Sequence, residues 1–231
     1  MRIASDEFWP GVRDSLPVLL GVIPFGLTCG VMGVTVGLTS LENISMSMLV
    51  FAGASQFVSM TMLGAGITGL SLIVLTTLLV NLRYLLMGAS LAPYMTRLPL
   101  PWQALLAFSV VDESYVLTMD RIRQKKYSPS YHLGCNLPFY FIWNTSNAAG
   151  MFLGGYIPDP LVWGLDFALP AMFLALLIPR LIDRVSFCVF SVAALVAVWG
   201  ALYLPGKWYI ILACLAASVV GGIMGGESKH A

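Results

Sequence analysis

Residues 43–82 read NISMSMLVFAGASQFVSMTMLGAGITGLSLIVLTTLLVNL and include no charged side chain. A membrane-spanning helix needs about 20 predominantly apolar residues, so this run is long enough for two spans. Only helices and closed barrels satisfy the backbone hydrogen-bonding groups inside lipid. Because the apolar residues are continuous rather than alternating, the run predicts transmembrane helices.

The rest of the chain has the same character. Hydrophobic residues make up 58% of the sequence and charged residues 10%, whereas an average soluble domain has about 25% charged residues. Further uncharged runs extend from Ser15 to Leu41, from Tyr127 to Pro158 and from Val185 to Gly206. The formal net charge of +1 does not indicate a nucleic-acid partner. The composition therefore places the chain in a lipid bilayer.

We predict an all-α, polytopic integral membrane protein with about eight transmembrane helices, in one domain over residues 1–231. Gly, Pro and charged residues divide the apolar sequence into spans at 15–38, 45–64, 68–90, 102–119, 132–155, 161–179, 185–204 and 207–225. The segment 102–119 contains two carboxylates. If it does not cross the membrane, the number of spans is seven.

Lys and Arg, which mark cytoplasmic loops, gather between alternate predicted spans. They precede the first span, follow the fourth, separate the sixth from the seventh and follow the eighth: Arg2, Arg13, Arg121, Arg123, Lys125, Lys126, Arg180, Arg184 and Lys229. The loops of the opposite side carry a single Lys, Lys207, and Arg97 is the one exception to the pattern. Both termini are therefore expected on the cytoplasmic side.

A weak internal repeat relates residues 14–119 to residues 130–226. Ile23-Pro24-Phe25 resembles Leu137-Pro138-Phe139, and the heptapeptide Phe51–Phe57 resembles Phe167–Phe173. Chance matches in apolar sequence are the alternative explanation. Repeated halves with interrupted helices are a common transporter design, in which the substrate binds between the halves. Eight spans would make the halves parallel, and three crossings in each half would make them inverted.

One candidate site is the small and polar segment Gly53, Ala54, Ser55 and Gln56, inside the predicted span 45–64. These residues could interrupt the helix and leave backbone N–H groups able to hold a carboxylate. Alternatively, the small residues allow close helix packing, and Gln56 forms an interhelical hydrogen bond.

Two further sites place charge within predicted spans. Arg83 either reaches an interface beside Tyr84, or forms an internal ion pair or a substrate carboxylate contact. Asp112 and Glu113 are adjacent, so on a helix they project about 100° apart. One of them could pair with Arg83 and the other could carry a proton. The alternative is that both lie in headgroup water.

Asp166 precedes the Phe-Ala-Leu-Pro segment that ends at Pro170, and it is either a helix N-cap or part of a site. Asn144 and Asn147 lie on one helix face, where they could line a polar path or join helices by hydrogen bonds. We find no Ser-His dyad, metal-ligand cluster, Walker loop or dinucleotide fingerprint. We therefore expect no enzymatic activity and no cofactor.

Taken in order, these motifs resemble those of the AzlC/YgaZ family, the large subunit of bacterial branched-chain amino acid exporters. The resemblance covers nearly the whole chain, and the Gly-Ala-Ser-Gln element together with the Asp-Glu pair is its most specific part. It rests on Gly21-Val-Ile-Pro24-Phe25-Gly26, Phe51–Phe57, Asn81-Leu-Arg83-Tyr84 with Pro93, Asp112-Glu113 and Asp166-Phe-Ala-Leu-Pro-Ala171.

The resemblance implies a transporter of the bacterial inner membrane that exports valine, leucine and isoleucine, driven by the proton motive force. It also implies a small membrane partner of the AzlD/YgaH type. An exporter of another small metabolite, or a structural subunit whose partner holds the binding site, are the alternatives.

The residues themselves are compatible with a zwitterionic, apolar substrate. Gly53–Gln56 or Arg83 could bind its carboxylate, and Asp112 or Glu113 could bind its ammonium group or the coupling proton. Three aromatic residues could shape an apolar pocket: Phe25, Phe57 and Phe173.

Overall fold

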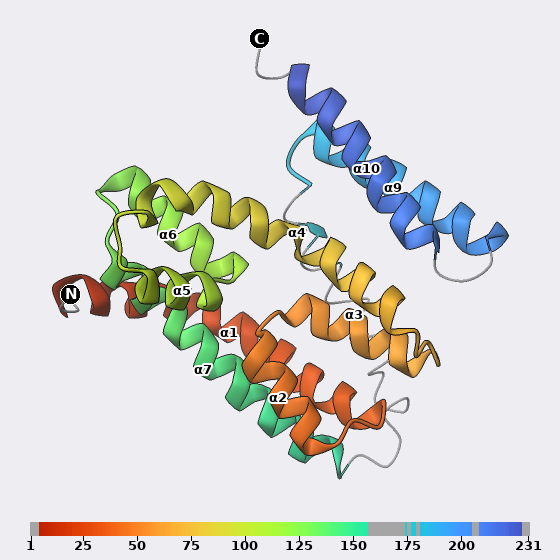
Figure 1. The fold of residues 1–231 in the computed structure, drawn as a ribbon, viewed down its shortest axis with the longest axis horizontal. Coiled ribbons are helices and arrows are strands. Elements are labelled where there is room, and N and C mark those ends of the chain that lie inside the picture. The colour runs from red at the N-terminus through yellow and green to blue at the C-terminus, as the bar shows by residue number, and fades with distance from the viewer. Residues whose placement is uncertain (1–4, 157–173, 175–176, 179–180, 205–207, 228–231) are drawn as a thin grey trace. The chain divides into compact units, whose positions relative to one another are not determined.

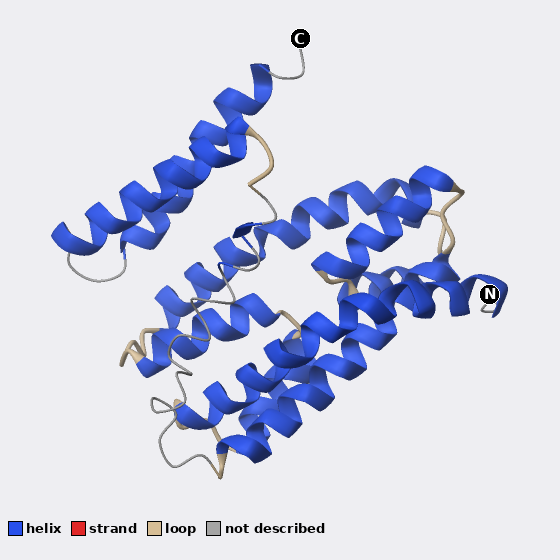
Figure 2. Cartoon of the chain, turned by 180° about the vertical axis from the view of Figure 1, so that it is seen from behind, coloured by secondary structure: helices blue, strands red, loops and turns tan. Residues whose placement is uncertain are grey.

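A computed structural model describes residues 5–156, 174, 177–178, 181–204 and 208–227 of the chain. Over these residues the regular structure is entirely helical (Figure 2), which agrees with the predicted class. The chain divides into two compact units, Met1–Asp166 and Phe167–Ala231, which we describe separately. Most of the predicted span 161–179, and the candidates Asp166 and Phe173, lie outside the described residues.

The first unit is built on two long helices, α1 (Ser5–Thr35) and α7 (Pro129–Gly154), which lie side by side (Figure 1). Gly11 packs against the backbone of Tyr131 to Cys135, and Gly30 against that of Asn147 to Met151. Because the residue numbers of both helices rise together along the contact, the helices run parallel. Glycine lets two backbones approach this closely.

The parallel direction bears on the predicted repeat, since α1 and α7 contain its two Pro-Phe motifs. A repeat of four spans in each half requires these helices to be parallel, as they are. Part of the second half lies outside the described residues, so the repeat stays a prediction.

The predicted span 45–64 is two helices rather than one. The first, α2 (Ser40–Val50), begins at a capping box in which Thr39 and Glu42 satisfy each other's backbone N–H groups. It ends at Phe51, whose φ of 46° lies in the left-handed region, and α3 (Gly53–Gly64) starts two residues later. The helix break therefore lies at Phe51 and Ala52, just before the Gly53–Gln56 segment where it was expected.

The predicted span 102–119 also consists of two helices rather than one continuous helix. Helix α5 (Leu100–Ser109) and helix α6 (Asp112–Gln124) are separated by Val110 and Val111, both in extended conformation. The Ser114 hydroxyl accepts a hydrogen bond from the Val111 N–H at 3.0 Å and so supports the start of α6. Two acidic residues in the first turn also favour a helix start, because they complement its positive dipole end.

Helix α4 (Leu70–Met95) is continuous and covers the predicted span 68–90. A buried apolar core packs α4 against α5, the α5/α6 break and α7, and consists of Leu91, Met95, Leu106, Val110 and Leu133. This core fixes the position of the α5/α6 break in the first unit.

The second unit contains the antiparallel pair α9 (Arg184–Tyr203) and α10 (Trp208–Glu227). Gly200, near the end of α9, contacts Tyr209, near the start of α10, and Gly221 contacts Val189 further along the pair. The bounds agree with the predicted spans 185–204 and 207–225.

Three helices of the described residues are long and apolar enough to cross a membrane: Asp6–Thr35, Leu70–Met95 and Arg184–Tyr203. The 26-residue α7 is as long as α4, but polar residues occur along its buried faces. These findings agree with a polytopic membrane protein, and the total of eight spans stays a prediction.

The close packing of α1 on α7 predicts different effects for two glycines of α1. A Cβ at Gly30 would clash with the Asn147 carbonyl oxygen, whereas a Cβ at Gly21 has nothing within 4 Å. Gly30→Ala should therefore lower the free energy of unfolding by about 1–3 kcal/mol, the usual cost of overpacking. Gly21→Ala should be neutral or slightly stabilising, because Ala favours helix. Thermal unfolding in detergent micelles measures both, and equal midpoints would contradict the packing.

Candidate functional site

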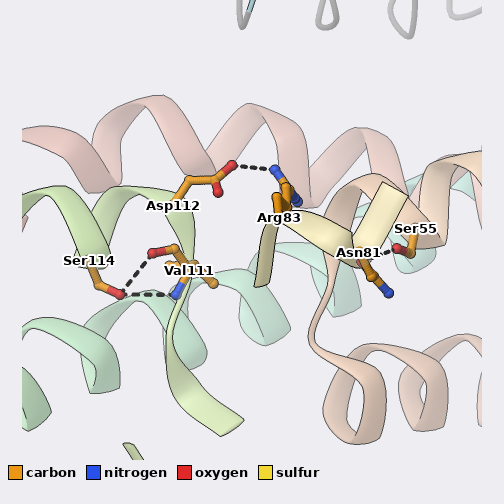
Figure 3. Close-up of polar contacts among 6 residues, drawn as sticks. All are labelled: Ser55, Asn81, Arg83, Val111, Asp112 and Ser114. Atoms are coloured by element: carbon orange, nitrogen blue, oxygen red, sulfur yellow. Dashed lines mark hydrogen bonds and ion pairs between the residues drawn. The ribbon is translucent and has the colours of Figure 1, made fainter. Parts of the chain in front are cut away.

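Helix α4 contacts the first turns of both helices that follow a break (Figure 3). The Ser55 hydroxyl, in the first turn of α3, donates to the Asn81 side-chain oxygen at 2.6 Å. Arg83, two residues further along α4, forms an ion pair with Asp112 at the start of α6. Neighbouring positions of one helix thus hold the N-terminal ends of α3 and α6.

The Arg83–Asp112 ion pair is partly buried, with side-chain exposures of 31% for Arg83 and 18% for Asp112. The guanidinium also lies 5.0 Å from the centre of the Tyr84 ring, within the range of a cation–π contact. Of the interpretations of Arg83 from sequence, the internal ion pair is the one that the structure contains. Contact with a substrate stays a prediction.

The carboxylates of α6 lie at a helix break instead of inside a continuous span. Asp112 and Glu113 are the first two residues of α6, and both are partly buried. A carboxylate is favoured at a helix N-terminus by the unpaired N–H groups and by the helix dipole. The first turn of α6 can therefore carry negative charge, which can attract an ammonium group or a proton.

The start of α3 has the opposite chemistry. Its first turn contains no acidic residue, and Ala52 before it offers no side-chain cap. The first N–H groups of an α-helix have no partner within the helix, and such groups bind anions. Gly53 and Ala54 in this turn are partly exposed, and their small side chains leave little bulk around its backbone N–H groups.

Gln56 joins α3 to two other helices. Its side-chain nitrogen donates to the Ser47 hydroxyl at 3.3 Å, and its side-chain oxygen accepts from the Trp143 indole N–H at 3.2 Å. The Trp143 N–H also reaches Ser47, at 3.0 Å. All three side chains are buried, and the Trp143 ring fills the space where a larger residue than Gly53 would place its Cβ. The interhelical role predicted for Gln56 is therefore present.

Helix α7 donates hydrogen bonds near the C-terminal ends of α2 and α5, the helices that precede the two breaks. The Asn136 side chain donates to the Leu106 carbonyl of α5 at 3.2 Å and to the Ser109 hydroxyl at 2.9 Å. The Tyr140 hydroxyl donates to the Met48 carbonyl of α2 at 3.2 Å. Such carbonyls, in the last turn of a helix, have no intrahelical partner. Residues 136 and 140 lie one helical turn apart, so the ends of α5 and α2 meet α7 about one turn from each other.

The other predicted residues are more scattered. Phe57 is fully buried in the core and Phe25 is partly buried on α1, so only Phe25 has exposed ring surface. Asn144 donates to the Tyr140 carbonyl of its own helix at 2.8 Å. Asn147 is buried where α7 meets Gly30.

The sequence reasoning missed the residues of α4 and α7 that hold the breaks. Asn81 was quoted only as part of a motif, and Asn136, Tyr140 and Trp143 were not selected. Their one signal was spacing, because positions 136, 140 and 143 follow the helical pattern i, i+4, i+7 on one face. Among the described residues, no group of three or more His, Cys, Asp or Glu could hold a metal ion.

Comparison with known proteins identifies a matching family and relatives that cover most of the chain. The AzlC protein family model matches residues 17–157. The inner membrane protein YgaZ of Escherichia coli is 33% identical over 223 residues, covering 94% of this chain and 89% of YgaZ. The branched-chain amino acid transport protein AzlC of Bacillus subtilis is 24% identical, covering 91% of this chain and 84% of AzlC. An uncharacterized membrane protein of Archaeoglobus fulgidus is 31% identical, covering 94% of this chain and 95% of the relative. No solved structure matches the chain.

The Arg83–Asp112 pair predicts a measurable energetic coupling. Asp112→Asn should leave the guanidinium without its counter-charge in an apolar setting, and Arg83→Met should do the converse. We expect the double variant to be more stable than the sum of the single effects, with a coupling of about 0.5–3 kcal/mol. Unfolding by heat or SDS in mixed micelles measures this.

The matched control for this cycle is Arg97→Met, since Arg97 follows α4 and is exposed. Combined with Asp112→Asn, it should be additive. Additive effects for Arg83 and Asp112 as well would show that the ion pair is energetically unimportant.

Proposed function

Since the chain belongs to the AzlC family of membrane transport proteins, we propose that it is a secondary transporter subunit that exports branched-chain and other hydrophobic amino acids. The Bacillus subtilis relative, which is named a branched-chain amino acid transport protein, supports this substrate class. The structural observation that carries the proposal is the pair of helix breaks in the first unit, with unlike chemistry at their two helix starts. Discontinuous helices of this kind form the substrate sites of many transporters.

A zwitterionic amino acid matches these two helix starts. The uncharged first turn of α3 is the proposed site for the substrate carboxylate, which would accept hydrogen bonds from its backbone N–H groups. The first turn of α6, with Asp112 and Glu113, is the proposed site for the ammonium group. Asn81 and Arg83 of α4 contact these two turns, so α4 connects the proposed carboxylate site to the proposed ammonium site.

We further propose that export is coupled to protons through the carboxylates of α6. Ionisable residues within membrane spans are rare, and in transporters they often relay protons. Asp112 is bound to Arg83, so uptake of a proton by Asp112 would weaken that ion pair. Protonation can in this way change the contact between α4 and α6, which is also where the substrate is proposed to bind.

The proposed location is the bacterial inner membrane with both termini in the cytoplasm, as part of a complex with a small AzlD/YgaH-type membrane subunit. One contact supports the orientation. Glu7, near the start of α1, pairs with Arg121, in the last turn of α6, at 2.7 Å. The start of α1 and the basic segment 121–126 therefore lie on one side of the first unit, as a shared cytoplasmic face requires.

Export of valine is testable in cells. Bacteria that lack the gene and its small partner should accumulate intracellular valine when fed a valine-containing dipeptide, because the peptide delivers valine that the cell must release. Expression of both genes should restore the low intracellular level, measured by mass spectrometry. Unchanged valine pools, with another metabolite accumulating instead, would favour an exporter of that metabolite. Binding of labelled valine by the purified chain alone would argue against a purely structural subunit.

Proton coupling is testable with amide variants in proteoliposomes. Asp112→Asn or Glu113→Gln should reduce accumulation driven by a pH gradient about tenfold or more if that carboxyl carries the proton. Exchange of labelled for unlabelled valine should fall less, because each variant keeps one carboxylate in the proposed ammonium site. Asp120→Asn is the control, because Asp120 is exposed near the other end of α6. Full gradient-driven transport in both variants would remove the carboxylates from the coupling mechanism.

A further inference from the structure

Three aromatic residues join the two helix breaks. Phe51 lies at the α2/α3 break, Phe108 in the last turn of α5, and Tyr140 on α7. The centre of the Tyr140 ring is 4.9 Å from that of Phe51, in edge contact, and 6.2 Å from that of Phe108. Phe51 and Phe108 are themselves 6.4 Å apart. Each ring of this aromatic cluster therefore contacts the other two.

Tyr140 is fixed at both ends of its side chain. Its hydroxyl bonds to the Met48 carbonyl of α2, while its ring contacts one residue from each break. Asn136, one turn earlier on α7, holds the end of α5. Because these contacts come from one rigid helix, Tyr140 occupies a defined position between the breaks.

Phe51 adopts a backbone conformation that is unfavourable for an aromatic residue. Its φ is 46°, and within the described part of the chain it is the one residue other than glycine with a positive φ. Glycine would adopt this conformation without steric cost, whereas an aromatic residue does so only where its surroundings over-determine it. Phe51 is 4% exposed and packs on Tyr140. The ring contributes contacts that a glycine at the break could not make.

The cluster is only partly covered. Phe108 is 47% exposed and Tyr140 is partly exposed, so an apolar edge stays accessible beside the buried Phe51 ring. Phe51 also precedes the first turn of α3 by two residues. The aromatic edge therefore adjoins the proposed carboxylate site along the chain, and its apolar surface suits an aliphatic group.

We propose that Phe51, Phe108 and Tyr140 form the subsite for the aliphatic side chain of the substrate, and that Tyr140 determines the size of side chain accepted. This inference rests on the proposed function. The carboxylate and ammonium groups are common to all amino acids, so selection among them requires a surface that contacts the side chain. In the described residues, the aromatic cluster is the apolar surface shared by the two breaks.

The test compares the KM for valine with that for phenylalanine in proteoliposomes that contain the chain and its small partner. Tyr140→Ala removes a ring from the subsite, so the ratio of the two values should shift about tenfold or more in favour of phenylalanine. Tyr140→Phe keeps the ring and loses only the hydroxyl, so its ratio should stay near the original. Phe152→Ala is the matched control, because Phe152 is an exposed aromatic residue on the same helix.

Phe108→Ala keeps the inference testable if Tyr140→Ala does not fold. It opens the same subsite from α5 and should shift the ratio in the same direction. Equal loss of transport for both substrates, with an unchanged ratio in both alanine variants, would overturn the inference and make Tyr140 a purely structural residue. If the unchanged protein transports no amino acid at all, the proposed function fails instead.

Discussion

A helix break in a membrane leaves carbonyl and amide groups that water cannot satisfy, so partners must come from the protein. The first unit meets this constraint at two breaks with the same pair of unbroken helices. Asn136 and Tyr140 of α7 bond to the carbonyl ends of α5 and α2. Asn81 and Arg83 of α4 contact the starts of α3 and α6. The positions of the broken helices therefore depend on α4 and α7.

Helix α7 can serve this purpose because α1 holds it along most of its length. The glycine contacts between α1 and α7 bring their backbones together, and side chains on a neighbouring face of α7 reach the breaks. Asn136, Tyr140 and Trp143 lie on that face. A rigid, closely packed pair thus supports a region in which the backbone is irregular, which is the arrangement expected where polar substrates bind within a membrane.

The proposed substrate would bind to three features of the first unit that differ in their chemistry. An uncharged helix start can bind a carboxylate, a helix start with two carboxylates can bind an ammonium group, and three aromatic rings can contact an aliphatic side chain. Each alone is a common structural feature. Their position at two adjacent breaks, in a chain of the AzlC family, supports one binding site for a hydrophobic amino acid.

The helical membrane class, most helix positions and an ion pair between Arg83 and an acidic residue followed from sequence, because hydrophobic length and buried charge are properties of short segments. The predicted break near Gly53 was almost correct, since small residues mark weak points of a helix. The break at Val110 was not predicted, because that segment is as apolar as an unbroken span. Only the tertiary structure decides where such a segment breaks, since the freed carbonyls need donors such as Asn136, which lies 30 residues from Leu106 along the chain.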